Sequence, residues 1–155
     1  MAYRQQVPAS WLKDSPNTAK LGHFYSVDQA VGVNSPNKRE DVMLVQLMMS
    51  VVADTKLYVA TQIPWNHPPI RVDGNGDQRM IARIYTYQLM NSSGLTINGR
   101  VDPANTKESP IGQGRLMLMH LNILLAMDSP TEFRDLSAVK GVPADLAKAI
   151  KGFRP

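Results

Sequence analysis

The sequence of 155 residues contains no cysteine and no long apolar run, and its charges are not gathered into blocks. Without cysteine, neither a disulfide framework nor a thiolate metal site is possible. No stretch approaches the ~18 consecutive apolar residues of a membrane span, and residues 1–14 lack the apolar core of a signal peptide. We therefore expect a protein that is made in the cytoplasm and has no membrane partner. Action in the periplasm or at the cell wall would need a route independent of a signal peptide.

Positive charge is in modest excess and is scattered along the chain. Seventeen Lys and Arg residues face thirteen Asp and Glu residues, which gives a net charge of +4, yet only Lys38 and Arg39 are adjacent. This balance favours anionic partners weakly, whereas a nucleic-acid binder concentrates its basic residues on one face. We expect no nucleic-acid partner.

Hydrophobic residues make up 43% of the chain and charged residues 19%, as in an ordinary globular domain. Apolar spacing predicts one helix of about four turns from Lys38, capped by Asn37, and others over Gln78–Asn91, Gln113–Met127 and Pro143–Lys151. Residues 1–38 carry scattered Pro, Asn and Ser and are predicted to be loop with at most one short helix. Within residues 54–71, Lys56–Ala60 is compatible with an extended segment, and Ile63–Ile70 is predicted to form an inserted loop interrupted by prolines.

One pattern occurs twice, 25 residues apart: Val72-Asp73-Gly74-Asn75-Gly76-Asp77 and Ile97-Asn98-Gly99-Arg100-Val101-Asp102. Each copy is a hydrophobic residue followed by an Asx-Gly pair and a further Asp. Such pairs favour tight turns, because Gly accepts a positive φ and the Asx side chain can bond to nearby backbone. Two similar turns on either side of one helix indicate a small repeated unit.

The order of these elements resembles that of the peptidoglycan-binding domain family. Its members are small three-helix modules attached to many cell-wall hydrolases. The matching residues are Asp41-Val42 to Gln46, Val72-Asp73-Gly74, Ile84, Tyr87-Gln88, Gly94-Leu95, Ile97-Asn98-Gly99, Val101 and Pro103. The resemblance covers residues 27–125. It implies an all-α fold: a three-helix bundle over residues 27–127, with an N-terminal arm (1–26), the inserted loop and a C-terminal helical extension (128–155).

Three positions, which follow the two turns, depart from the family pattern. Asp77 and Met80 stand where the family usually has Gly and then Thr, and Asp102 stands where it has Gly after the second turn. Thr is a good helix N-cap and Met is not, so we expect Asp77 or Gln78 to start the second helix.

The sequence predicts no catalytic residue, no metal site and no cofactor. The segment from Asp73 to Asp77 begins like a calcium loop, but an EF-hand needs Gly at its sixth position and Glu at its twelfth, where this chain has Gln78 and Ile84. The three histidines lack metal-ligand spacing, and no nucleophile motif or phosphate loop is present. Gln46 and Gln88 are expected to bond loop backbone that would otherwise be buried unpaired.

By the resemblance, the function is noncatalytic recognition of peptidoglycan, either its glycan or its stem peptide. Such a module could bring a separately encoded hydrolase or toxin to the wall, for example in phage lysis or contractile secretion. The rival hypothesis is a cytoplasmic adaptor, chaperone or immunity protein that keeps the fold without binding the wall. Trp65 either stacks on a sugar or fills the core. The candidate ligand-binding residues are Trp65, Arg71, Asn75, Arg79, Tyr85, Asn98 and Arg100.

Overall fold

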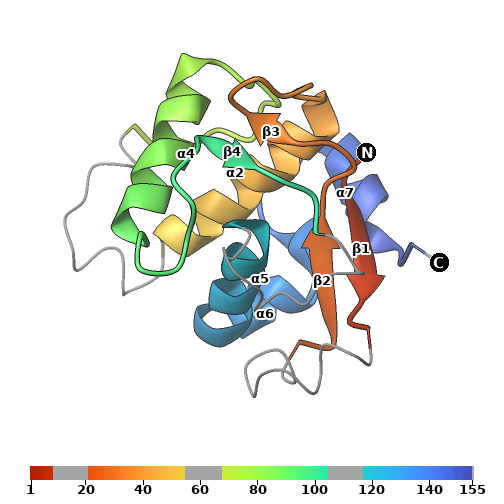
Figure 1. Ribbon diagram of the computed structural model, residues 1–155. Coiled ribbons are helices and arrows are strands. Elements are labelled where there is room, and N and C mark those ends of the chain that lie inside the picture. Colours follow the sequence, from red (N-terminus) through yellow and green to blue (C-terminus); the bar gives the residue numbers. More distant parts are fainter. Residues whose placement is uncertain (9–20, 55–67, 105–116, 155) are drawn as a thin grey trace.

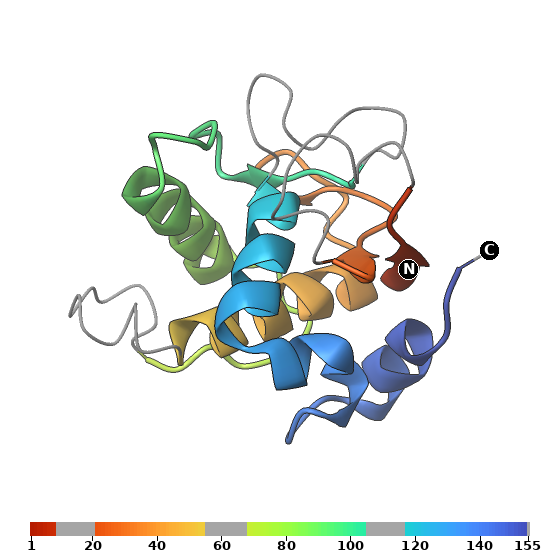
Figure 2. The same cartoon turned by 90° about the horizontal axis from the view of Figure 1, so that it is seen from below.

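Helix α2 (Arg39–Ala53) lies at the centre of the protein (Figures 1 and 2). The structure is a computed structural model that describes residues 1–8, 21–54, 68–104 and 117–154. All residues of α2 except Arg39, Glu40 and Ser50 are buried, because β3, α5 and α7 all pack against this helix. Within the described residues, no helix combines the length and the apolar character that a membrane crossing requires.

The other helical elements all follow α2 in the sequence. They are α4 (Gln78–Met90), α5 (Met117–Asp128), the short α6 (Pro130–Arg134), the 3-10 turn η3 (Leu136–Ala138) and α7 (Ala144–Lys151). Four short strands accompany them: β1 (Tyr3–Gln6), β2 (His23–Ser26), β3 (Val31–Gly32) and β4 (Arg100–Val101). The strands form two antiparallel sheets of two strands each, so the expectation of an all-α fold is wrong.

The first sheet replaces the loop predicted for the N-terminal arm. Strands β1 and β2 pair from Tyr3 opposite Ser26 to Gln6 opposite His23. All four residues of β2 are buried. On α5, the Asn122 side chain accepts a hydrogen bond from Tyr25 N (2.7 Å) and donates one to Tyr25 O (2.9 Å). The middle of β2 is therefore hydrogen-bonded to a helix as well as to β1, which satisfies buried backbone groups.

The second sheet joins the segment before α2 to the second Asx-Gly turn. Val31 pairs with Val101 and Gly32 with Arg100, and Val33 N donates to Gly99 O (2.9 Å). Asn37, expected to cap α2, instead bonds through its side chain to the N–H and C=O of Gly32 and to Ser35 O. The N-cap position of α2 belongs to Lys38, which makes no side-chain cap bond.

One apolar core runs through the arm, the helical module and the C-terminal extension. Ala2 and Phe24 from the arm, and Leu136 and Ile150 from the extension, lie in the same buried cluster as the α2 residues. Helix α7 packs on both β1 and α2. The division of the chain at residues 26 and 127 stays a prediction, but the described parts on either side of these boundaries share their packing.

The predicted helices agree with the structure within the described residues. Helix α4 begins at Gln78 with Asp77 as its N-cap, whose carboxylate accepts from Arg79 N and Met80 N (both 3.0 Å), which confirms the expected role of Asp77. Helix α7 begins directly after Pro143, as predicted. The expected start of the third helix at Gln113 lies outside the described residues.

Candidate ligand-binding site

The first Asx-Gly turn is held from inside by the side chain of Gln46. Its Oε1 accepts hydrogen bonds from Asp73 N (3.0 Å) and Gly74 N (2.8 Å), and its Nε2 donates to Asp73 Oδ1 (2.9 Å) and Asn75 O (3.2 Å). Gly74 has φ +77°, a conformation that residues with a Cβ rarely adopt. Only 4% of the Gln46 surface is exposed, and its amide satisfies turn backbone groups, as the sequence predicted.

The second turn repeats this arrangement around Gln88. Oε1 of Gln88 accepts from Asn98 N (3.0 Å) and Gly99 N (2.8 Å), while Nε2 donates to Asn98 Oδ1 (3.1 Å) and Arg100 O (2.9 Å). Gly99 has φ +67°. The role predicted for Gln88 is thus confirmed, and the two turns are two copies of one hydrogen-bonded unit.

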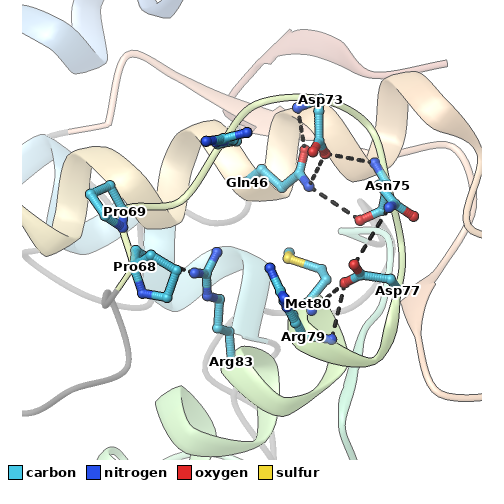
Figure 3. Close-up of a pocket in the computed structure, with 10 residues that line it drawn as sticks. Gln46, Pro68, Pro69, Asp73, Asn75, Asp77, Arg79, Met80 and Arg83 are labelled. Atoms are coloured by element: carbon cyan, nitrogen blue, oxygen red, sulfur yellow. Dashed lines mark hydrogen bonds between the residues drawn. The ribbon is translucent and has the colours of Figure 1, made fainter.

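A cavity of about 430 Å³ opens beside the first turn. Its walls come from α2, from the loop before the turn and from the first part of α4 (Figure 3). The side chains of Arg79 and Arg83 reach from α4 into the hollow that faces Gln46, and Pro68 and Pro69 form the rim across from Asn75 and Asp77 (Figure 3). The lining residues are Gln46, Pro68, Pro69, Arg71, Asp73, Asn75, Asp77, Arg79, Met80 and Arg83.

The described residues that border this cavity include three arginines, which differ in their contacts. Arg83 Nη2 donates to Pro68 O (2.5 Å), which ties α4 to the loop. Burial is the main cause that lowers the pKa of Arg83; the charge of Asp77 opposes this shift, and the charge of Arg79 adds to it. Within residues 1–8, 21–54, 68–104 and 117–154, the side chains of Arg71 and Arg79 have no hydrogen-bond or ion-pair partner, and both residues are exposed. They are therefore available to an anion.

The two carboxylates at the cavity are already engaged with the backbone. Asp73 Oδ1 accepts from Asn75 N (2.9 Å) and from Gln46, and Asp77 accepts from the first amides of α4. The hydrogen bond from Asn75 N is the main cause that holds the pKa of Asp73 below its ordinary value, with the Gln46 amide and the charge of Arg71 adding to it. Both carboxylates stabilise the turn and the helix start, so neither neutralises the arginines by a direct ion pair.

The structure divides the sequence-predicted site residues into two groups. Arg71, Asn75 and Arg79 lie together at the cavity. Tyr85, Asn98 and Arg100 belong to the second turn, where Asn98 is bonded to Gln88 and Arg100 Nε donates to Asp102 Oδ1 (2.7 Å). A Cβ added at Gly99 would lie 2.4 Å from the Tyr85 ring, so Tyr85 packs directly on this turn. Trp65 lies outside the described residues.

Sequence reasoning missed Arg83 and Met80 as cavity residues. The signal for Arg83 was available, since residues four apart on a helix share a face and Arg79 is already a candidate. The sequence singled out Met80 only as a poor N-cap; it is 2% exposed and still contributes to the cavity wall.

The histidines within the described residues have structural contacts. His23 is buried between Arg4 and the backbone O of Phe133, and His120 Nδ1 lies 2.7 Å from the Tyr87 hydroxyl oxygen. Across the described part of the chain, no group of three or more His, Asp or Glu side chains is placed to hold a metal ion.

Comparisons of the chain with protein-family models, with curated proteins and with solved structures found no match.

Proposed function

We propose that this protein binds bacterial cell-wall peptidoglycan without cleaving it, through the cavity at the first Asx-Gly turn. The observation that carries the proposal is the pair Arg71 and Arg79, whose guanidinium groups border the cavity without a partner among the described residues. The stem peptides of peptidoglycan carry carboxylates, and guanidinium groups bind carboxylates through charge-assisted, often bidentate hydrogen bonds.

The arrangement of the turns supports the same proposal. The elements that resemble the peptidoglycan-binding family are the two turns and the helices that carry Gln46 and Gln88, and these two residues make matching contacts. In this proposal the protein acts in the periplasm or at the wall after export by a signal-independent route. Its protein partner is a separately encoded hydrolase or toxin, which it localises on the wall.

Retention on purified sacculi at moderate salt tests the proposal. The informative variant is Arg71→Gln with Arg79→Gln, because neither side chain has a partner in the described structure and their loss should change stability by less than about 0.5 kcal/mol. Asn75→Ala is less suitable, since the Asn75 side chain donates to Asp77, the N-cap of α4. Lys148→Gln with Lys151→Gln is the matched control: it removes two exposed charges from α7, which lies away from α4 in both views (Figures 1 and 2).

The wild-type protein and the α7 control should sediment with the sacculi, and the double arginine variant should stay in the supernatant. Circular dichroism of all three proteins checks that they are folded. If the wild-type protein is not retained, wall binding is wrong, and the adaptor, chaperone or immunity hypothesis takes its place. If the double arginine variant is retained as well as the wild type, the wall is bound through another surface.

A further inference from the structure

We infer that the cavity binds one free carboxylate of the stem peptide, held by Arg71 and Arg79, and that it does not bind the glycan. This inference rests on the proposed function and specifies which chemical part of the wall is recognised. Four features of the described residues lead to it: the charge of the cavity, the fixed position of Arg83, the nature of the walls and the contrast with the second turn.

The charge of the cavity matches a single anion. Among the described residues that line it are three arginines and two aspartates, which leaves one positive charge in excess in this part of the lining. The aspartates are fixed by backbone N–H groups of the turn and of α4, so they cannot move to pair with the arginines without breaking those bonds. One carboxylate neutralises the excess, whereas an uncharged sugar leaves it unchanged.

The arginines that remain available come from two different elements. Arg71 belongs to the loop before the turn and Arg79 to the first turn of α4. Arg83 donates to Pro68 O and thereby links this loop to the helix. The link restricts the separation between loop and helix before a ligand arrives, and such preorganisation lowers the cost of ordering the site on binding.

The walls suit a peptide better than a sugar. Among the described residues that line the cavity none is aromatic, and its apolar surface comes from Met80, Pro68 and Pro69. These side chains can contact the aliphatic part of an amino acid beside its carboxylate. The Gln46 amide at the back of the cavity is occupied by the turn itself, so it offers little hydrogen bonding to sugar hydroxyls.

The second turn is a built-in comparison. Its backbone is bonded by a Gln side chain in the same way. Its arginine, however, is already ion-paired: Arg100 Nη2 lies 2.5 Å from Asp102 Oδ1. The first turn has no such pair among the described residues. The two copies of this structural unit thus differ in whether their arginines are ion-paired within the described residues. The copy beside the unpaired Arg71 and Arg79 is the one that borders the cavity.

Titration calorimetry with three soluble wall fragments tests the inference. The fragments are a disaccharide with its stem peptide and free carboxylates, the same fragment with every carboxylate amidated, and the disaccharide alone. The wild-type protein should bind the first at least tenfold more tightly than the other two. Arg71→Gln with Arg79→Gln should weaken binding of the first fragment at least tenfold, and Lys148→Gln with Lys151→Gln should leave it unchanged.

The results that overturn the carboxylate inference differ from the results that overturn wall binding. Equal affinity for the free and amidated fragments, or binding of the bare disaccharide, overturns the carboxylate inference, while retention on sacculi keeps the proposed function. Sacculus retention without binding of the free-carboxylate fragment also overturns the inference. Absence of both retention and fragment binding overturns both proposals.

Discussion

Gln88 makes, on the turn that contains Asn98, the same set of hydrogen bonds that Gln46 makes on the turn that contains Asp73. In both cases the amide oxygen accepts two successive backbone N–H groups, at 3.0 and 2.8 Å, and the amide nitrogen donates to the Asx side chain and to a backbone carbonyl. The repetition visible in the sequence is therefore a repetition of contacts, with each turn anchored by a helix residue.

Gln88→Ala should destabilise the protein strongly. The substitution leaves the part-buried N–H of Asn98 and the buried N–H of Gly99 without their acceptor, and an unsatisfied buried group costs about 1–3 kcal/mol. We expect a loss of about 2–4 kcal/mol in the free energy of unfolding, measured by urea denaturation. Gln78→Ala, the same change at an exposed position of α4, is the control and should stay within about 0.5 kcal/mol. Similar losses in both variants would contradict the anchoring role.

Gly99→Ala should cost more than Gly141→Ala. Both glycines have positive φ, +67° and +87°, so both substitutions pay the ~1–2 kcal/mol of a left-handed residue. A Cβ at Gly99 also lies 2.4 Å from the Tyr85 ring and 2.8 Å from Val33, whereas at Gly141 nothing lies within 4 Å. The difference in unfolding free energy between the two variants measures this steric term. Equal effects would mean that the second turn can relax away from Tyr85.

His23 should make the protein less stable in acid. Arg4 can only donate, so His23 Nδ1 accepts from Arg4 Nη2 and the ring is neutral, with Nε2 donating to Phe133 O. Burial, followed by the charge of Arg4, lowers the pKa of His23 to about 4. The unfolded chain takes up this proton near pH 6.5 and the folded chain only near 4. The stability that neutral His23 provides is therefore complete above pH 6.5 and is lost as the pH falls toward 4.

The lost contribution is at most about 3.5 kcal/mol, since one pKa unit corresponds to about 1.4 kcal/mol. The charged and titratable groups around the ring are Arg4, Tyr25 and Asp135. Urea denaturation at pH 7 and pH 4.5 should show a larger fall for the wild type than for His23→Gln, which cannot titrate. Parallel falls would assign the acid sensitivity to carboxylates. An NMR titration of the His23 ring gives the pKa directly.

Asp77→Asn should separate helix capping from the charge of the cavity. Asn caps helices about as well as Asp, so stability should change by less than about 0.5 kcal/mol, whereas Asp77→Ala should lose about 1 kcal/mol. Removing the carboxylate raises the excess positive charge of the cavity, so Asp77→Asn should bind the free-carboxylate fragment severalfold more tightly. The measurements are urea denaturation and titration calorimetry. Weaker binding by a fully stable Asp77→Asn protein would show that Asp77 contacts the ligand favourably.

The elements predicted well were those with a strong local signal. Apolar spacing located α2, α4 and α7 closely, and the poor capping ability of Met80 correctly directed attention to Asp77. The Gln46 and Gln88 contacts followed from a general rule, that a polar side chain on a buried helix face must find partners.

The strands were missed because their stability depends on distant partners. Strand β2 is buried on both faces, so it shows no alternation of polar and apolar residues, and β1 is a polar segment that pairs with it. Strands β3 and β4 have two residues each and pair across about 70 positions, which no local pattern reveals. Asn37 favours bonds to Gly32 over the helix cap for the same reason, since that loop is shaped by its pairing with the second turn.

The candidate site was predicted in part. Arg71, Asn75 and Arg79 are neighbours at one cavity because one turn connects them, but the sequence could not separate them from Arg100, whose charge is closed by Asp102. Whether an arginine forms an ion pair depends on side-chain geometry. An Asx-Gly turn lies near both the paired and the unpaired arginines, so the sequence motif does not distinguish them.

The hydrogen bonds of Gln46 hold the first turn from the side of α2, and they involve neither Arg71 nor Arg79, so the anchoring of the turn is separate from these two charges at the cavity. The backbone of the turn needs Gln46, Gly74 and the Asp73 carboxylate, but it does not need Arg71 or Arg79. We therefore expect neutral residues at positions 71 and 79 to leave the turn folded. A set of variants built on one unchanged scaffold could then be selected for wall fragments of different charge.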